Sequence, residues 1–341
     1  MSSIALVTDC YSKMTLSKKI LLLGVTASGK ARLAFDLARH LHGEIVSVDS
    51  MKVYRRMDIG TAKPSKEAQL KVPYHMIDVV EPSESYDVAT FYERATREMD
   101  KIQLRRRPTI LVGGTAMYIK ALLYGLFAGP GADDAVRQRL KQRVEAQGLD
   151  SLHQELARVD PAAAGRINPK DERRIVRALE VFELTGQPIS SLQTQFDAAK
   201  TPSEWIIIGL RRDKTLESQR INARVKKMVE AGLVREVQSL LSEEPCLSKQ
   251  TRSAIGYAEI IDHLAGGMDI ERTIEQIKIS TRRLAKGQRT WFKTFPFVHW
   301  ITLDDESTAE KTLHRTLRIL AYEQDTGSGR EGLAQPEEGE N

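Results

Sequence analysis

Short runs rich in apolar residues alternate with stretches of helical periodicity in the first third of the chain. These runs occupy Ile20–Leu23, Glu44–Val48 and Thr109–Val112, and glycine or polar residues bound each of them. After the first run, leucines recur at every fourth position over Leu33–Leu41, as they do on one face of a helix. Such alternation is typical of a parallel sheet covered by crossover helices.

The remainder of the chain changes character at two places. Residues 127–200 are charged, helical in pattern and punctuated by proline-containing turns. A β-rich apolar run returns at Trp205–Leu210. Two long helical segments follow near 214–241 and 271–293, and Val298–Ile301 is the last strand candidate. This order predicts a sheet interrupted by a helical insertion.

The first apolar run leads directly into a glycine-rich turn and then a helix. The turn has the pattern G-x-x-x-x-G-K and consists of Gly24, Val25, Thr26, Ala27, Ser28, Gly29, Lys30 and Ala31. In this setting backbone N–H groups and the helix N-terminus point at an anion, and Lys30 adds a full positive charge. The pattern predicts a phosphate-binding cradle, and the alternative is a glycine-rich turn without a ligand.

The residue after the cradle lysine departs from this motif. That position normally carries the Ser or Thr whose hydroxyl binds Mg²⁺, whereas this chain has Ala31. A methyl group does not coordinate a cation, so the sequence leaves the metal ligands unknown. Either other groups hold Mg²⁺ or the site binds it weakly.

The second apolar run ends at an acidic residue, Asp49. The carboxyl end of a parallel strand faces the ligand crevice, which places this carboxylate near the predicted cradle. Three interpretations are open from the residues alone. Asp49 is a reactive group, a Mg²⁺ ligand of an ordinary nucleoside triphosphatase, or a helix cap.

We therefore predict an α/β fold, with a P-loop NTPase-like parallel sheet core and an inserted helical domain. The core is expected to comprise residues 18–126 and 201–303, and the insertion residues 127–200. Residues 1–17 are expected to be a disordered extension. Residues 323–341 are glycine-rich and strongly acidic, so we expect a disordered tail there as well.

Charge and cysteine content narrow the class of protein. The net charge is +5, and a basic body favours a polyanionic partner such as nucleic acid. Cys10 and Cys246 lack metal-ligand spacing, which argues against a zinc site or disulfide scaffold and favours the reducing cytoplasm. The chain shows neither a long apolar stretch nor a signal-peptide pattern, so we expect no membrane association.

The helical segment near 271–293 has an apolar face and a basic face. The apolar face carries Ile274, Ile277, Thr281, Leu284 and Trp291. The basic face carries Lys278, Arg282, Lys286, Arg289 and Lys293. No acidic residue falls between the ends of this basic stripe, whereas a solvated surface usually mixes charges of both signs. We therefore favour contact with phosphates.

Seven ordered blocks resemble the tRNA dimethylallyltransferase family of bacterial type. They are GVTASGK, SVDSMKVYRRMDIGTAKP, VPYHMIDVVEPSESYDVATF, ILVGGTAMYIKALLYGL, INPKDERRIVRALEVFELTGQPIS, QRINARVKKMVEAGLVREV, and AIGYAEI followed by TRRLAKGQRTWFK. The resemblance covers about residues 18–300. It implies that a dimethylallyl group passes from dimethylallyl diphosphate to the exocyclic amine of the adenosine 3′ to the anticodon of tRNA, with Mg²⁺ as cofactor.

The resemblance also implies roles for single residues. Asp49 matches a general base, the cradle and Arg220 match groups that bind the diphosphate, and Thr115 matches a contact to the adenine. The implied catalytic residues are Asp49, Thr115, Lys30 and Arg220. The implied and expected tRNA-binding residues are Asp49, Ser50, Met51, Lys52, Thr115, Arg137, Arg173, Arg174, Arg177, Lys278, Arg282, Lys286, Gln288, Arg289 and Lys293.

Two positions depart from relatives and leave other functions open. Lys52 stands where relatives commonly have a neutral residue, and Gly287 where they commonly have arginine. A catalytically weakened tRNA-binding relative is one alternative. An adenylate isopentenyltransferase and a small-molecule P-loop kinase are two more, although neither explains the basic stripe. We expect a cytoplasmic monomer whose partner is the tRNA anticodon stem-loop.

Overall fold

The computed structural model describes residues 18–127, 129–193 and 203–327, without the side chains of 324–327. The expected disordered extension, residues 1–17, and residues 328–341 of the expected tail lie outside these ranges. Backbone contacts divide the chain into two compact units. The first combines Met1–Leu123 with Thr201–Asn341, and the second is Tyr124–Lys200.

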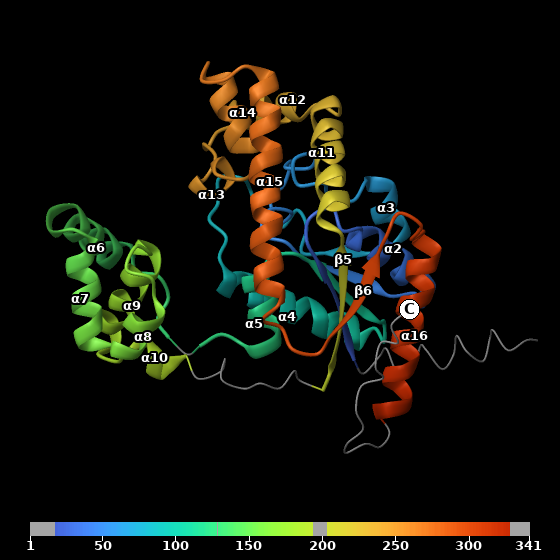
Figure 1. Cartoon of the computed structure of the whole chain (residues 1–341), viewed down its shortest axis with the longest axis horizontal. Helices are drawn as coiled ribbons and strands as arrows, with labels where there is room; N and C mark the ends of the chain where they lie inside the picture. Colours follow the sequence, from blue (N-terminus) through green and yellow to red (C-terminus); the bar gives the residue numbers. More distant parts are fainter. Residues whose placement is uncertain (1–17, 128, 194–202, 328–341) are drawn as a thin grey trace, which may run out of the picture. The chain divides into compact units, whose positions relative to one another are not determined.

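The first unit is built around a six-stranded sheet in which all neighbouring strands are parallel (Figure 1). The strand order is β3-β2-β4-β1-β5-β6. The strands are β1 (Lys19–Gly24), β2 (Glu44–Val48), β3 (Tyr74–His75), β4 (Thr109–Gly113), β5 (Trp205–Arg212) and β6 (Val298–Leu303). The predicted α/β fold is thereby confirmed. The sequence pattern missed β3, because two half-buried residues are too few to show a period.

Ten helices within the described residues of this unit surround the sheet and rise above its edge. They are α2 (Lys30–Leu41), α3 (Lys66–Lys71), α4 (Val88–Leu104), α5 (Ala116–Tyr124), α11 (Lys214–Glu230), α12 (Leu233–Leu241), α13 (Lys249–Arg252), α14 (Tyr257–Leu264), α15 (Ile270–Phe292) and α16 (Ala309–Gly327). Leu33 and Leu37 of α2 pack into the same buried cluster as Leu320 of α16. The chain therefore contributes to this core beyond residue 303, and residues 323–327 are helical rather than part of a tail.

The long helical segment expected near 214–241 is two helices. Gly232 lies between α11 and α12 with a φ of 104°, a left-handed conformation that glycine adopts without steric cost. α15 runs beside α11, and α14 packs against both α12 and α15 (Figure 1). These four helices form a cluster next to the sheet.

The second unit is entirely helical among its described residues. Its helices, apart from the end of α5, are α6 (Asp134–Gln147), α7 (Leu149–Val159), α8 (Pro161–Arg166), α9 (Glu172–Thr185) and α10 (Ile189–Leu192). They enclose a separate apolar core that includes Leu140, Leu152, Leu156 and Leu179. An independent core is what a domain inserted between two stretches of sheet requires.

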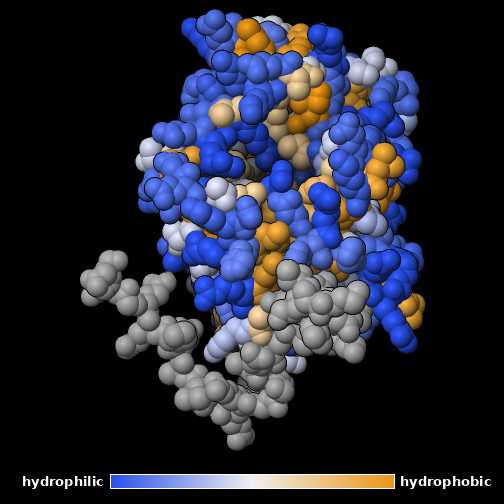
Figure 2. Space-filling model, turned by 90° about the vertical axis from the view of Figure 1, so that its right-hand side faces the viewer, coloured by the Kyte–Doolittle hydropathy of each residue, from blue (hydrophilic) through white to orange (hydrophobic). Residues whose placement is uncertain are grey.

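No helix in the described part of the chain is long and apolar enough to cross a membrane. The face shown in Figure 2 is mostly hydrophilic, and its hydrophobic residues occur in small, separate groups. Scattered exposed apolar residues of this kind are normal on a folded domain and mark no large apolar surface.

Candidate active site

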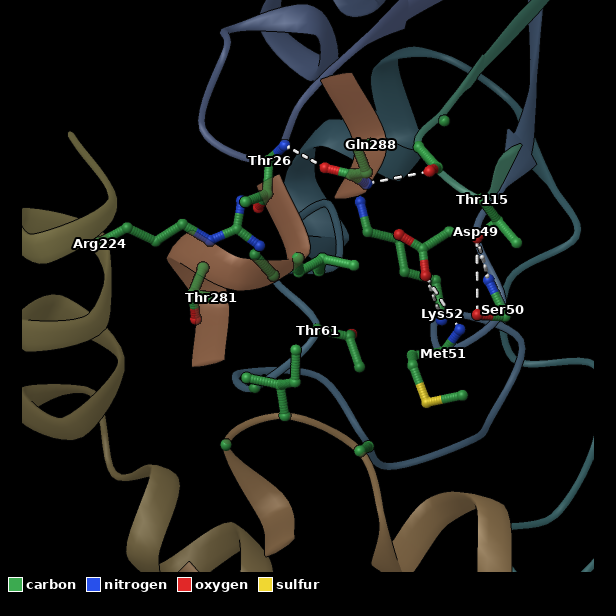
Figure 3. Close-up of a pocket in the computed structure, with 18 of the residues that line it drawn as sticks. Thr26, Asp49, Ser50, Met51, Lys52, Thr61, Thr115, Arg224, Thr281 and Gln288 are labelled. Carbon is green, nitrogen blue, oxygen red and sulfur yellow. Dashed lines mark hydrogen bonds between the residues drawn. The ribbon is translucent and has the colours of Figure 1, made fainter. Parts of the chain in front are cut away.

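Three adjacent strands bring the predicted reactive groups together. β2, β4 and β1 are neighbours, with Val48 and Leu23 both paired with Gly113. The cradle follows β1, Asp49 follows β2 and Thr115 follows β4 within two residues. One cavity of about 780 Å³, which lies entirely in the first unit, is lined by Asp49, by Thr115 and by Thr26, Lys30 and Ala31 of the cradle (Figure 3). Strand order thus explains why residues far apart in sequence meet here.

The cradle turns through two left-handed residues. Ala27 has a φ of 62° and Gly29 a φ of 103°, and α2 begins immediately afterwards. The N–H groups of Ala27 and Gly29 donate to no acceptor among the described residues. The Lys30 ammonium donates to the Val25 carbonyl at 3.1 Å. The turn therefore presents free donors and a cation beside a helix N-terminus, as anion binding requires.

Asp49 is held by the turn that follows it. Its Oδ1 accepts hydrogen bonds from the N–H groups of Met51 at 2.9 Å and Lys52 at 3.3 Å. No further hydrogen bond or ion pair engages this carboxylate among the described residues. Asp49 lines the cavity with one oxygen fixed by the backbone (Figure 3). The remaining oxygen is therefore available to a ligand.

The Thr115 hydroxyl contacts the turn that carries Asp49. It accepts from the Ser50 N–H at 3.1 Å, and it lies 3.5 Å from the Ser50 hydroxyl. The contact joins the end of β4 to the end of β2, so the Thr115 side chain positions this turn. The Thr115 carbonyl meanwhile accepts from the Ile119 N–H of α5 at 3.1 Å. Its hydroxyl and that of Ser50 both line the cavity next to Asp49.

Gln288 of α15 crosses the site as a bridge. Its Oε1 accepts from the Thr26 N–H at 2.8 Å, and its Nε2 donates to the Gly114 carbonyl at 2.9 Å (Figure 3). A Cβ on Gly114 would lie only 2.4 Å from the Gln288 amide nitrogen, so any other residue there would displace this bridge. We expected Gln288 to contact tRNA. The structure shows its side chain tying the cradle to β4 at the wall of the cavity, and the contact with tRNA stays a prediction.

Three cations surround the single carboxylate. Lys30, Lys52 and Arg224 line the cavity, and Asp49 is the one acidic residue among its described lining residues. Burial, together with the charges of Lys52 and Arg224 and against the opposing effect of Asp49, lowers the pKa of Lys30 to about 7. Burial likewise lowers the pKa of Lys52 and of Arg224. Excess positive charge in a partly buried site favours a polyanionic ligand.

Arg224 was missed from the sequence, while Arg220 was expected. Arg220 donates to the Ala27 carbonyl at 2.9 Å. A second cavity of about 340 Å³ is lined by Arg220, Arg224 and Lys227 of α11 and by cradle residues, and it shares Lys30 and Ala31 with the first. The spacing of these three cations, four and three residues, is that of one helix face. This spacing was the signal that could have revealed Arg224.

The opposite part of the cavity is apolar. Helices α11, α12, α14 and α15 contribute side chains that include Met228, Leu233, Tyr257, Ile277 and Trp291. The predicted apolar face of α15 thus lines a cavity, although Ile274 does not take part in it. A surface of this kind accepts hydrocarbon and aromatic groups but not ions.

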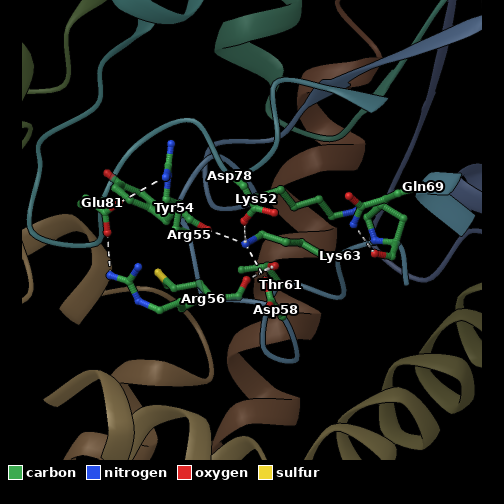
Figure 4. Close-up of polar contacts among 12 residues, drawn as sticks. Lys52, Tyr54, Arg55, Arg56, Asp58, Thr61, Lys63, Gln69, Asp78 and Glu81 are labelled. Carbon is green, nitrogen blue, oxygen red and sulfur yellow. Dashed lines mark hydrogen bonds and ion pairs between the residues drawn. The ribbon is translucent and has the colours of Figure 1, made fainter. Parts of the chain in front are cut away.

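One buried lysine fixes the loop that forms the cavity wall (Figure 4). The Lys63 ammonium is bound by Asp58 at 2.7 Å and by Asp78 at 2.6 Å, and it also donates to the Tyr54 carbonyl. Glu236 accepts three backbone N–H bonds from residues 58–60. The loop between Asp49 and Lys63 is therefore held in place before any ligand arrives.

The basic stripe on α15 is partly neutralised by acids from outside it. Lys278 and Arg282 both pair with Glu275, and Arg289 pairs with Glu217 of α11. Lys286 and Lys293 are exposed and form no ion pair among the described residues. The available charge on this face is thus smaller than the sequence implied.

Two arginines of the insertion are also engaged. Arg137 and Arg177 both bind Glu180, whose side chain is fully buried. Arg174 pairs with Asp171 at 3.3 Å, and Arg173 is exposed without such a partner in the described chain. These contacts give Arg137 and Arg177 a clear structural role.

His75 lies in β3 beside the start of β2, whereas Asp49 follows the end of that strand. Its Nε2 is 2.7 Å from Glu44, its Nδ1 is 3.3 Å from Glu98, and Arg105 also binds Glu44. His75 therefore belongs to a structural cluster with these partners, and none of them is among the described residues that line the cavity.

Comparison with known proteins gives one consistent result. Residues 52–295 match the family model described as IPP transferase. The chain is 45% identical over 285 residues to a tRNA dimethylallyltransferase of Geobacter metallireducens, covering 84% of this chain and 92% of that protein. It is 42% identical over 305 residues to one of Caldanaerobacter subterraneus, covering 89% and 97%.

Solved structures agree with these relatives. The tRNA isopentenylpyrophosphate transferase of Bacillus halodurans superposes with a TM-score of 0.65 at 36% identity, covering 92% of this chain and 100% of that one. A eukaryotic dimethylallyltransferase acting on tRNA superposes with a TM-score of 0.76 at 26% identity, covering 92% and 80%.

Proposed function

The chain belongs to the IPP transferase family, and we propose how its residues divide the work of that family's reaction. The protein is a prenyltransferase that transfers a dimethylallyl group to tRNA. In our proposal the donor is dimethylallyl diphosphate, and the acceptor is the exocyclic amine of the adenosine 3′ to the anticodon. The observation that carries the proposal is the juxtaposition of a three-cation cluster, one carboxylate and an apolar wall in one cavity.

Asp49 is the proposed general base. The adenine amine is a weak nucleophile, because its lone pair is delocalised into the ring. As the nitrogen bonds to C1 of the dimethylallyl group, the C1–O bond breaks and the diphosphate leaves with the bonding electron pair. The amine then loses one proton to the free oxygen of Asp49. The turn that binds the other oxygen keeps this carboxylate aimed at the cavity.

The cradle, including Lys30, is proposed to bind the diphosphate together with Arg220 and Arg224 of α11. Free N–H groups at Ala27 and Gly29 suit phosphate oxygens, and the Lys30 ammonium and the Arg224 guanidinium supply charge. Arg220 is already directed at the cradle through the Ala27 carbonyl. Donors fixed in advance stabilise the charge that develops on the departing oxygen.

The apolar wall is proposed to receive the hydrocarbon part of the donor and the acceptor base. An adenine within a folded anticodon loop is stacked, so it must leave the stack to reach Asp49. Trp291 and Tyr257 give the cavity aromatic surface on which a base can pack. The Thr115 and Ser50 hydroxyls beside Asp49 are proposed to contact the adenine amine.

The residues present fit a protein-held Mg²⁺ poorly. Ala31 replaces the usual hydroxyl ligand, and Asp49 is the one carboxylate among the described lining residues. No group of three or more His, Cys, Asp or Glu in the described chain is arranged to hold a metal ion. The proposed chemistry therefore uses no metal bound by the protein. The Mg²⁺ expected from the resemblance stays a prediction, and no proposed step depends on it.

Exposed cations are proposed to bind the anticodon stem-loop. Lys286, Lys293 and Arg173 have no ion-pair partner among the described residues, so their charge is available to phosphates. Arg174, Lys278, Arg282 and Arg289 would first have to leave an acidic neighbour.

We also infer a monomer in the cytoplasm, where the tRNA substrate and a reducing environment are found.

The test of this function is a transfer assay with two rival acceptors. Labelled dimethylallyl diphosphate is incubated with the protein and either unmodified tRNA, with adenosines 3′ to the anticodon, or AMP. We expect label on tRNA alone, located by nuclease digestion at the adenosine 3′ to the anticodon. Label on AMP alone would instead identify a nucleotide prenyltransferase. Absence of label with intact tRNA binding would identify a non-catalytic tRNA-binding protein.

A further inference from the structure

The cavity contains two cations without a direct partner. The Lys52 ammonium and the Arg224 guanidinium form no hydrogen bond or ion pair with any described residue, although both line the cavity. Partly buried charges are costly unless a counter-ion accompanies them. Asp49 is the single acidic residue of the described lining, and it accepts from the Lys52 backbone N–H. One carboxylate does not balance three cations, so the site is built for a ligand with several negative charges.

The same cavity lacks the protein oxygen that a P-loop uses to hold Mg²⁺. Ala31 lines the cavity beside Lys30, and its methyl group replaces that hydroxyl. One cavity thus contains a methyl group where the motif carries a metal-binding hydroxyl, together with the ammonium of Lys52. A divalent ion there would also be repelled by Lys30, Lys52 and Arg224 at short range.

We propose that the Lys52 ammonium takes the place of a protein-held Mg²⁺, so that this chain binds the diphosphate of its donor without a divalent ion. The inference rests on the proposed function, because the diphosphate is the ligand assigned there. Lysine binds phosphate as a point charge, and lysine and Mg²⁺ act in the same way on charge that develops at phosphate oxygens.

The backbone around Lys52 is held from both sides. The Lys52 N–H donates to Asp49, and the Lys52 carbonyl accepts from the Asp78 N–H at 3.2 Å. Asp78 in turn binds the buried Lys63 ammonium at 2.6 Å (Figure 4). The ammonium of Lys52 is therefore anchored at its base while its tip remains unpaired. Such preorganisation is what replaces the fixed geometry of a metal ion.

The charge of Lys52 acts on the cradle. After burial, Lys52 is the strongest influence that lowers the pKa of Lys30. The two ammonium groups are thus close enough to repel one another, and one diphosphate between them would relieve that repulsion. If Lys52 interacted with Asp49 alone, its effect on the pKa of Lys30 in the cradle would have no explanation.

The test is calorimetric titration of the full chain with inorganic diphosphate, in EDTA and in Mg²⁺. The variants are Lys52→Gln, Lys52→Arg and the double variant Ala31→Thr with Lys52→Gln. Lys71→Gln is the matched control, because Lys71 is exposed at the end of α3 and has no ion pair among the described residues. Transfer of labelled dimethylallyl to tRNA is measured in the same samples.

Wild type and Lys71→Gln should bind diphosphate in EDTA within about threefold of their affinity in Mg²⁺. Lys52→Gln should lose about 10- to 100-fold in EDTA, as expected for one hydrogen bond to a charged group. Lys52→Arg should retain metal-independent binding, which shows that charge rather than altered folding is responsible. The double variant should regain affinity when Mg²⁺ is added, because it combines the restored hydroxyl with a neutral residue at position 52.

Two results would overturn the proposal. One is wild-type binding that collapses in EDTA. The other is Lys52→Gln binding that equals wild type in EDTA while transfer alone is impaired, which would assign Lys52 to Asp49 or to tRNA. Metal-dependent binding with normal transfer would refute this inference and leave the proposed function standing. Metal-independent binding that requires Lys52, with no transfer, would support the inference and contradict the proposed function.

Discussion

The cations of the cavity and those of the insertion have opposite surroundings. In the cavity, Lys52 and Arg224 have no ion pair, and Lys30 donates only to a backbone carbonyl within the described chain. In the insertion, Arg137 and Arg177 are both bound to the fully buried Glu180. The first group is thus available to a ligand, whereas the second stabilises its own unit.

This comparison shows what a basic residue in a sequence does not reveal. A charge is available only if no acid from another segment reaches it. Helix α15 contains both cases, because Arg289 is bound by Glu217 of α11 while Lys286 is exposed and without an ion pair in the described chain. The cations available to a ligand, Lys30, Lys52 and Arg224, are therefore identified by their surroundings in the fold.

The largest effect is expected at the one carboxylate of the cavity. Asp49→Asn keeps the oxygen that accepts from Met51 and Lys52, so the turn should persist, but it removes the base. Transfer to tRNA should fall about 10²- to 10⁴-fold, the usual contribution of a general base. Single-turnover transfer and filter binding of tRNA measure the two properties separately. A large loss of tRNA affinity with little loss of the transfer rate would instead make Asp49 an RNA-positioning group.

The next largest effect distinguishes the cations of the cavity from those of the insertion. Arg224→Met should weaken diphosphate binding about 10- to 100-fold, because it removes a charged hydrogen-bond donor from the ligand. Thermal stability should not fall, since Arg224 has no ion pair or hydrogen bond in the described part of the protein. Calorimetry and a melting curve test both statements. Normal diphosphate affinity in this variant would remove Arg224 from the site.

Arg177→Met should have the reverse outcome. It leaves the buried Glu180 with one partner fewer and removes contacts to the Pro130 and Gly131 carbonyls. The second unit should lose about 1–3 kcal/mol of stability, the cost of under-satisfying a buried polar group. Denaturant unfolding measures that loss, while diphosphate affinity serves as the internal control and should be unchanged. If Arg177→Met and Arg224→Met lost diphosphate affinity equally, the cations of the cavity and of the insertion would not have the different roles assigned to them.

A smaller effect is expected from pH. The pKa of Lys30 is lowered to about 7, so this ammonium is progressively lost as pH rises above 7. Diphosphate favours the charged form, and binding should therefore take up a proton and weaken by up to about tenfold per pH unit. Calorimetry at pH 8 in two buffers of different ionisation enthalpy measures this uptake. Lys30→Met should lack it, and equal uptake in both proteins would assign the proton to another group.

The smallest effect concerns the outer face of α15. Lys286→Ala should weaken tRNA binding and lower the slope of log affinity against log salt by about 1, the value for one phosphate contact. Arg289→Ala should change this slope less, since Glu217 already neutralises that charge. Binding curves at several salt concentrations distinguish the two. The same slope change for both would mean that Arg289 exchanges Glu217 for tRNA.

The sequence was sufficient for the elements that depend on local pattern. β1, β2 and β4 appear as apolar runs because both of their faces are buried, and the cradle follows from a motif fixed by backbone geometry. It was insufficient where the outcome depends on a distant partner. Gln288 looks like one polar residue in a basic helix, and only the fold shows that it bridges Thr26 and Gly114.

The roles of Arg224 and Lys52 also depend on residues that are distant in the sequence. Arg224 was missed, whereas Lys52 was noticed but its role was not. Arg224 lies on one face of α11 with Arg220 and Lys227, whereas Lys226 is exposed and paired with Glu230. That spacing alone does not show that this face meets the cradle. Lys52 stood out as a departure from relatives, but its meaning depended on what lies across the cavity. The acids that neutralise the basic stripe and the insertion arginines were invisible for the same reason.

A crystal structure of this protein with inorganic diphosphate would show whether the unpaired cations of the cavity hold the leaving group. We expect a diphosphate in the cavity, with its oxygens bound by the N–H groups of the cradle and by Lys30, Lys52 and Arg224. The free oxygen of Asp49 should remain uncovered and directed at the apolar side. A diphosphate bound outside this cavity, or one that contacts neither Lys52 nor Arg224, would contradict the claim that these unpaired cations exist to hold the leaving group.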